Sequence, residues 1–206
     1  MLAGLAAVLI VAVAFAGLRV NNLVHRLTSA PLTNPKSPST TPPDSSTPDW
    51  FSALPFNCLG SAGLATGPAP ALAYIDAVRT APQPGYDRVA IQFAGGAPAN
   101  AEVLTQHGAT FKQGASGQTV TLNGKEGVMV TIHSADGHTH YDGPTNIKTG
   151  DGVVLELYKV QDYDGTVQWA IGLSQMPCFR IGFLDNPTRL VIDFRASSAT
   201  PSRESA

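Results

Sequence analysis

The sequence predicts an all-β domain, a β-sandwich, preceded by an apolar N-terminal helix and a disordered linker. Two observations support this fold class. Apolar residues alternate with small or polar ones in short runs, and a period of two places alternate side chains on opposite faces of a strand. Turn-forming residues separate the runs, and no stretch of the domain keeps a helical period. Short strands with regularly placed turns are typical of a sandwich or a barrel.

The segment 1–20 is predicted to be a signal peptide or a membrane anchor. Leu2 to Leu18 is an uncharged apolar run, close to the shortest helix that spans a membrane and also suitable as a signal-peptide core. Residues 21–49 form a linker rich in Pro, Ser and Thr, which cannot bury enough apolar surface to fold. We therefore expect an extracytoplasmic protein, secreted or anchored to the cell membrane and facing the cell wall.

The folded domain is predicted at residues 50–197, followed by a polar, disordered tail at 198–206. Trp50 and Phe51 mark the return of large apolar side chains. The loop 60–70 is rich in small residues, and Pro82, Pro84 and Gly85 are expected to end the first strand. Strands are expected at 72–78, 87–93, 101–105, 119–122, 128–132, 153–160, 167–173, 179–183 and 190–194.

Turn signals refine this expectation. Asn123-Gly124 favours a type I′ hairpin between 119–122 and 128–132. Asp164-Gly165 is expected to turn the chain into the strand of Trp169, which shares its alternation with Val167 and Ile171 and so belongs in the core. Residues 185–188 form a further turn, and 133–149 is expected to be a long polar loop.

Two cysteines, Cys58 and Cys178, lie far apart in the sequence and outside any C-x-x-C pair. In an oxidising compartment the simplest interpretation is one disulfide that closes a long loop. The alternative is a pair of buried free thiols.

The loop after residue 132 concentrates potential metal ligands. His138 and His140 can present both rings on one side of an extended segment, and His133 with Asp136 or Asp142 can complete a site. The spacing matches no standard zinc signature, so we favour an exposed polar loop and predict no metal, no cofactor and no catalytic residue.

Arginines provide the candidate ligand contacts. Arg88, Arg180 and Arg189 fall on the polar faces of predicted strands, and a guanidinium group suits carboxylates, phosphates and sugar acids. We favour the alternative that they pair with Asp87, Asp185 and Asp193 across strands. The formal net charge of −2 includes no basic stripe, so no nucleic-acid partner is expected.

Five stretches together resemble the actinobacterial, mycobacterial-type AMIN-like domain. They are 85–93 (GYDRVAIQF), 141–144 (YDGP), 160–165 (VQDYDG), 169–173 (WAIGL) and 187–194 (PTRLVIDF). The resemblance implies a β-sandwich akin to the AMIN domains of cell-wall amidases, which help to place their enzymes in the envelope, apparently through peptidoglycan.

The chain departs from that pattern in two ways. It leaves no room for the zinc-dependent catalytic domain of such an amidase, and no lipobox cysteine follows the apolar run. The resemblance therefore implies a non-enzymatic exported envelope module, with peptidoglycan or an envelope protein as partner. The alternatives are a small secreted metal-dependent hydrolase that uses the loop from His133 to Asp142, and a protein-interaction domain of the envelope or division machinery.

Overall fold

The computed structural model describes residues 47–58, 60–66, 72–114, 116–150 and 152–196. The predicted N-terminal helix, nearly all of the predicted linker and the C-terminal tail lie outside these residues. The described chain is all-β, as predicted, with one short helix, α1 (Asp49–Ser52). Within the described ranges, no helix has the length and apolar character needed to cross a membrane.

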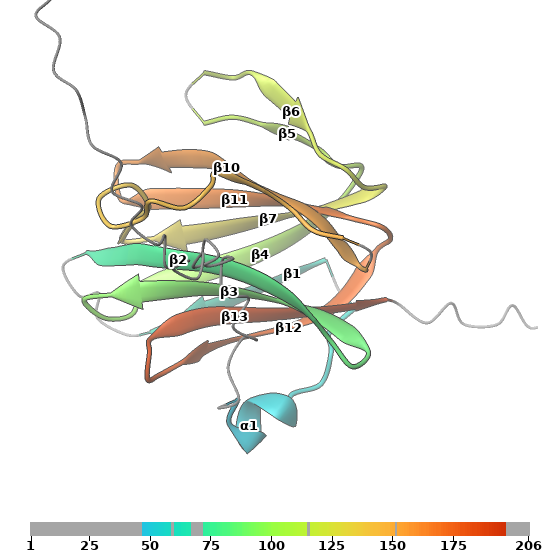
Figure 1. Ribbon diagram of the computed structural model, residues 1–206, viewed down its shortest axis with the longest axis horizontal. Coiled ribbons are helices and arrows are strands. Elements are labelled where there is room, and N and C mark those ends of the chain that lie inside the picture. Colours follow the sequence, from blue (N-terminus) through green and yellow to red (C-terminus); the bar gives the residue numbers. More distant parts are fainter. Residues whose placement is uncertain (1–46, 59, 67–71, 115, 151, 197–206) are drawn as a thin grey trace, which may run out of the picture. The chain divides into compact units, whose positions relative to one another are not determined.

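Two large curled sheets make up the domain (Figure 1). One has six strands in the order β1 (Ser61–Ala65), β4 (Asn100–His107), β7 (Glu126–His133), β11 (Thr166–Leu173), β10 (Val154–Tyr163) and β9 (Asn146–Lys148). The other has five, in the order β12 (Pro177–Leu184), β13 (Arg189–Ala196), β3 (Tyr86–Ala94), β2 (Ala73–Gln83) and β8 (Ala135–Asp136). Neighbouring strands are antiparallel except β2 and β8, which pair in parallel.

The apolar faces of the two sheets share one core. The alternation predicted from the sequence supplies it, because every second residue of β3, β7, β11, β12 and β13 points inward. Trp169 is fully buried, which confirms its predicted place, and the ring of Tyr141 meets it edge-on at 6.0 Å between centroids.

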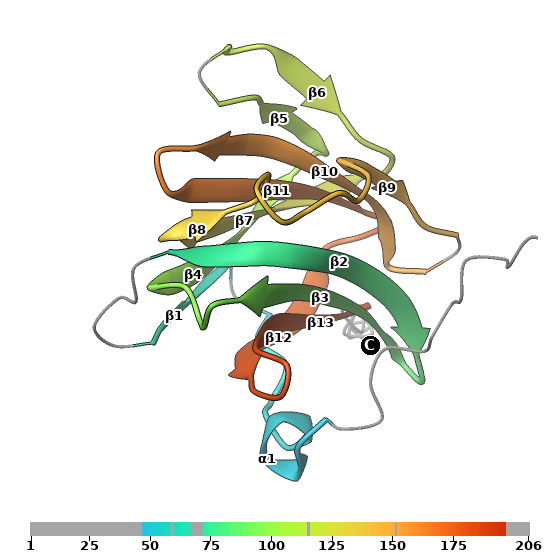
Figure 2. The ribbon, with the colours of Figure 1, turned by 60° about the vertical axis from the view of Figure 1, so that its left-hand side comes forward.

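The outer face of each sheet is also partly covered. Residues 47–58, here called the strap, place Phe51 and Leu54 against Ala90, Leu184 and Val191 on the outside of the five-stranded sheet. On the six-stranded sheet the cover is a small hairpin of β5 (Thr110–Lys112) and β6 (Thr119–Thr121), whose apolar side chains pack on β10 and β11. Figure 2 shows α1 and this hairpin at opposite sides of the domain.

The prediction of a hairpin at Asn123-Gly124 is wrong. β6 pairs with β5, whereas β7 pairs with β4 and β11. Asn123 donates its backbone N–H to a carboxylate oxygen of Glu156 at 2.8 Å, and Lys125 donates to the carbonyl of Leu173 at 2.8 Å. These contacts with β10 and β11 carry the chain across the sheet instead of turning it back. The two-residue turn with positive φ at both positions lies at Asp164-Gly165, where a turn was predicted.

Three predicted breaks in the strands also need correction. The loop expected at 60–70 contains β1, and the loop expected at 133–149 contains β8 and β9. β2 continues through Pro82, which pairs with Asp87. Because β8 pairs only with the first two residues of β2, this end of β2 is a sheet edge, where proline is tolerated.

Candidate functional site

Four polar side chains lie together where β8 and β10 approach each other and are here called the polar cluster: Asp136, His138, Lys159 and Asp162. Asp136 ends β8, His138 follows it in the loop, and the other two lie near the end of β10. The Nδ1 atom of His138 lies 3.5 Å from Asp136 Oδ1 and 3.3 Å from Asp162 Oδ1. Lys159 Nζ lies 2.7 Å from Asp162 Oδ2 and donates to the carbonyl of Gly137 at 2.7 Å.

The loop itself shapes this cluster. Asp136 Oδ1 accepts the backbone N–H groups of His138 and Thr139 at 2.9 and 2.8 Å, and Oδ2 accepts the Thr139 hydroxyl. Burial by itself would raise the pKa of Asp136. The hydrogen bonds from Thr139 and His138, with the nearby imidazole of His138, outweigh that effect, so the pKa of Asp136 lies below its ordinary value. The side chain is therefore held as a carboxylate.

Three donors of the polar cluster are close enough to share a cation. One ligand atom each from Asp136, His138 and Asp162 lies within 4.8 Å of the others. Carboxylate oxygen with imidazole nitrogen suits a divalent ion such as Zn²⁺ or Mn²⁺. The ammonium group of Lys159 already balances charge on Asp162, however, so the four groups also form a network of ion pairs that needs no ion.

The structure disperses the other predicted ligands. His133 ends β7 and places its Nδ1 3.3 Å from the hydroxyl of Thr166. His140 stacks on Tyr74, with 4.5 Å between ring centroids and 16° between planes. Asp142 is exposed. The pKa of the neighbouring Tyr141 is raised, mainly because Tyr141 is partly buried and secondly because the charge of Asp142 lies close to it. Of the histidines proposed from the sequence, His138 alone joins an aspartate pair among the described residues.

The predicted arginines lie within the domain, and their side chains are buried. Arg88 on β3 and Arg180 on β12 flank Asp193 on β13, and both donate to its carboxylate, which is fully buried. The predicted cross-strand pairing is therefore confirmed for Asp193. Arg189 donates to the backbone carbonyls of Asp185 and Pro187 in the turn before β13.

Aromatic side chains of the strap cover Arg88 and Arg180. The guanidinium carbon of Arg180 lies 4.7 Å from the ring centroid of Phe56 and 5.2 Å from that of Phe51, and Tyr86 on β3 lies at 5.1 Å. Arg180 also donates to the carbonyl of Ser52 at 2.6 Å. Cation–π contacts and this hydrogen bond therefore hold the strap against the sheet.

A disulfide fastens the end of the strap, as predicted. Cys58 is bonded to Cys178 on β12, with an S–S distance of 1.99 Å. One residue earlier, Asn57 exchanges two backbone hydrogen bonds with Phe179, at 2.7 and 2.9 Å. The strap thus continues the five-stranded sheet for a single residue beyond its edge strand, β12.

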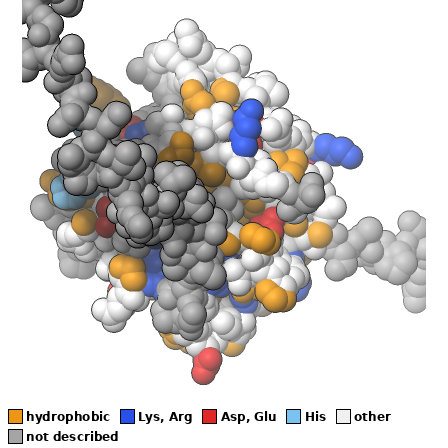
Figure 3. Space-filling model, viewed as in Figure 1, with side chains coloured by type: hydrophobic (Ala, Val, Ile, Leu, Met, Phe, Trp, Pro, Cys, Tyr) orange, Lys and Arg blue, Asp and Glu red, His pale blue; other side chains and the backbone are white. Residues whose placement is uncertain are grey.

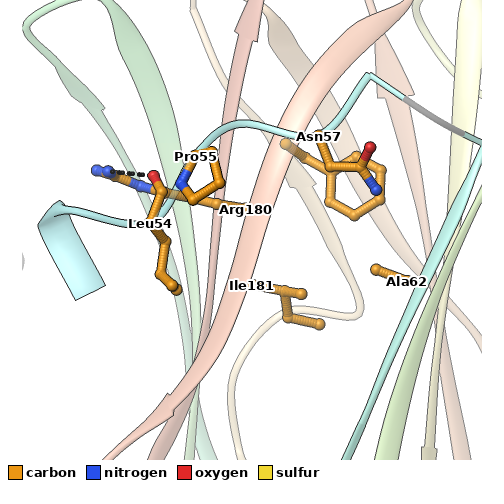
Figure 4. A pocket seen from close by; sticks show the side chains of 7 residues that line it. Leu54, Pro55, Asn57, Ala62, Arg180 and Ile181 are labelled. Atoms are coloured by element: carbon orange, nitrogen blue, oxygen red, sulfur yellow. Dashed lines mark hydrogen bonds between the residues drawn. The ribbon is translucent and has the colours of Figure 1, made fainter. Parts of the chain in front are cut away.

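An apolar pocket of about 190 Å³ opens next to the backbone pairing of Asn57 with Phe179. Figure 4 shows Ile181 on β12 and Ala62 on β1 facing the same space, with Leu54, Pro55 and Asn57 along its rim. The pocket therefore lies where the edge strands of the two sheets approach each other.

Two features of the structure were missed from the sequence. Asp162 was not among the predicted ligands, because no local pattern connects it with the loop after β7. The strap was read only as the start of the domain. The pairing of Cys58 with Cys178 was the one signal that could have placed it on β12.

Comparison with known proteins gives one family. The AMIN-like domain model matches residues 73–196, which span β2 to β13. Neither the curated proteins nor the solved structures gave a match. Because the family model covers more than half of the 206 residues, this chain belongs to the AMIN-like domain family.

Proposed function

We propose that the protein is a non-enzymatic, extracytoplasmic module of the cell envelope, of the actinobacterial type that its motifs resemble. The match of residues 73–196 to the AMIN-like domain carries this proposal. The Cys58–Cys178 disulfide supports the location, because such bonds persist in oxidising compartments outside the cytoplasm. The N-terminal segment would deliver the domain there as a signal peptide or a membrane anchor.

The proposed ligand is peptidoglycan or another wall polymer. The polar cluster and the neighbouring stack of Tyr74 and His140 offer what such a polymer requires: hydrogen-bonding groups beside a flat ring. His138 and His140 are exposed there. We propose this end of the domain as the contact surface, with Arg88, Arg180 and Arg189 supporting the fold behind it.

Charge is consistent with a neutral or mixed ligand. On the face seen in Figure 3, the basic side chains of the described residues lie apart from one another, with acidic and apolar ones between them. The net charge of −2 gives the chain no overall attraction to a polyanion. Binding to the wall would therefore rest on hydrogen bonds and ring stacking rather than on long-range attraction.

A co-sedimentation experiment tests the proposal. The full chain is incubated with insoluble purified peptidoglycan, and the bound fraction is measured as the amount of polymer is varied. Saturable binding is expected, and a His140→Ala variant should weaken it because the stacked ring is lost. Retention no greater than that of an unrelated acidic domain of similar size would refute the ligand. A matched variant, His107→Ala, removes an exposed histidine on β4 and should bind normally.

A metal-dependent hydrolase is the second candidate, because three donor atoms lie within 4.8 Å in the polar cluster. It requires stoichiometric metal in the purified protein and loss of that metal in His138→Ala. Elemental analysis of both proteins decides the matter. One zinc or manganese per chain that disappears in the variant would favour the hydrolase over the non-enzymatic module.

A further inference from the structure

We propose that the outer edge of β1 binds an extended peptide segment of a partner protein. The segment would add a strand to the six-stranded sheet and place one aliphatic side chain in the pocket between β1 and β12. This inference concerns a different face from the polar cluster, so it stands or falls independently of peptidoglycan binding.

The direction of the backbone groups of β1 follows from its ends. Thr105 donates its N–H to the carbonyl of Gly60 at 2.7 Å, and Thr66 donates to the carbonyl of Ala99 at 3.0 Å. In an antiparallel ladder the residues that face the partner strand alternate with those that face away. Ser61, Gly63 and Ala65 therefore direct their N–H and C=O groups away from β4, and all three are exposed.

This edge lacks the usual protection against strand addition. Charged side chains, proline and bulges normally guard an exposed edge, but β1 has the sequence SAGLA and keeps an unbroken register with β4. The other described edges differ from it. β5, β6, β8 and β9 have only two or three residues, and the strap already pairs with β12 at Phe179. β2 and β10 extend beyond β8 and β9, but both strands contain a bulge, and the extending parts carry charged side chains and, in β2, a proline. β1 is thus the edge without such protection among the described strands.

The pocket lies where an added strand would direct a side chain. Ala62 faces inward and lines the pocket with Ile181 and Leu54. In a pleated sheet, the residue opposite Ala62 on an added strand has its side chain on the same face. The volume of about 190 Å³ is below the roughly 300–1,000 Å³ of small-molecule sites, and its lining is mostly apolar, so one aliphatic side chain fits it best.

On the outer face of the same edge, an exposed carboxylate favours a basic residue in the partner segment. Gly63 pairs with Glu102, which is exposed, and Gly63 has no side chain of its own to cover it. A lysine or arginine opposite Gly63 can therefore reach across to that carboxylate. The partner segment is predicted to carry an aliphatic residue next to a basic one, with backbone hydrogen bonds providing affinity and these two side chains providing specificity.

Selection from a phage-displayed library of short random peptides on the full chain tests this inference. Enriched peptides are expected to contain an aliphatic residue adjacent to Lys or Arg. A synthetic peptide of the enriched sequence should lose about tenfold or more in affinity for Ala62→Leu, which fills the pocket, and for Gly63→Pro, which removes an outward N–H. Glu102→Gln should weaken binding of the basic peptides, whereas Asp142→Asn, which removes an exposed charge in the loop between β8 and β9, is the matched control and should leave binding unchanged.

Three results would overturn the inference. They are the absence of an enriched sequence, binding that is equal in wild type and both edge variants, and a dimer of the free chain that Gly63→Pro converts to a monomer in sedimentation velocity. The last result would assign the edge to a second copy of this chain. Circular dichroism of every variant shows whether the fold is kept, and two chemically different edge variants prevent one folding failure from deciding the outcome.

Discussion

Arg180 and Asp193 face each other on neighbouring strands of the five-stranded sheet, with Nε of Arg180 2.8 Å from Oδ2 of Asp193. Arg88 approaches the same carboxylate from the other side, at 2.7 Å from Oδ1. Asp193 is fully buried and neutralises two cations that are themselves nearly buried. The outer face of this sheet therefore depends on one acidic residue.

Replacing that residue is expected to be costly. Asp193→Asn keeps the shape but removes the negative charge that both buried guanidinium groups contact, and breaking a buried pair in this way typically costs about 3–5 kcal/mol. Urea unfolding followed by tryptophan fluorescence measures the loss. Asp185→Asn, in the exposed turn before β13, is the matched control and should change the free energy of unfolding by less than about 0.5 kcal/mol. Equal effects of the two variants would contradict this account.

The disulfide should stabilise the domain measurably. It joins residues 120 positions apart, and a crosslink that closes a long loop typically stabilises a fold by about 2–5 kcal/mol. The double variant Cys58→Ala, Cys178→Ala should lose this amount in urea unfolding. Reductant should bring the wild type down to the level of the variant and leave the variant itself unaffected. Two alkylatable thiols in the non-reduced protein would disprove the bond.

The crossing at Asn123-Gly124 makes a steric prediction. A Cβ atom added at Gly172 on β11 would collide with the backbone carbonyl of Asn123 and with Leu122, neither of which is a flexible side-chain end. Gly172→Ala should therefore destabilise the domain by about 1–3 kcal/mol, the usual cost of overpacking. Gly150→Ala is the control, because nothing lies within 4 Å of the added atom. A neutral Gly172→Ala would mean that the chain does not cross β11 there.

The same crossing shows where sequence reasoning succeeds and where it fails. Strands with clear alternation, such as 87–93 and 167–173, were predicted correctly because apolar residues at every second position indicate a strand with one buried face. Asn123-Gly124 has a strong hairpin signal, yet the contact with Glu156, 33 residues away, determines the path of the chain. β1 was not predicted, because its small residues have little strand propensity. It forms a strand through its pairing with β4.

Some features of the candidate sites could be predicted from the sequence, and others could not. The two cysteines allowed one pairing, so chemistry alone was enough to predict it. The polar cluster forms where the loop after β7 contacts the end of β10. No local sequence pattern predicts that Asp136 and Asp162 lie close together. The arginines were placed on strand faces correctly, but the strap that covers Arg88 and Arg180 is revealed only by the tertiary structure.

Acid should weaken the loop that carries the polar cluster. The folded-state pKa of Asp136 is lowered, so its carboxylate stabilises the fold at every pH above the unfolded value of about 3.9. That contribution is lost as the pH falls through the folded-state pKa.

Urea unfolding of wild type and Asp136→Asn between about pH 7 and pH 3 tests this prediction. The wild type should be more stable by a constant amount near neutral pH, and the difference should shrink on acidification below about pH 4. Asp142→Asn, an exposed position in the same loop, controls for the removal of a charge. A difference that grows as the pH falls would contradict the assigned direction.

The central claim is that this chain is a wall-binding module without catalytic activity, and a single incubation tests both halves of it. The full chain is mixed with insoluble peptidoglycan and added Zn²⁺, the mixture is centrifuged, and protein in the pellet and soluble wall fragments in the supernatant are both quantified. The account predicts saturable protein in the pellet and no release of fragments above a protein-free control. Protein that stays in the supernatant, or fragments that accumulate with time, would contradict it.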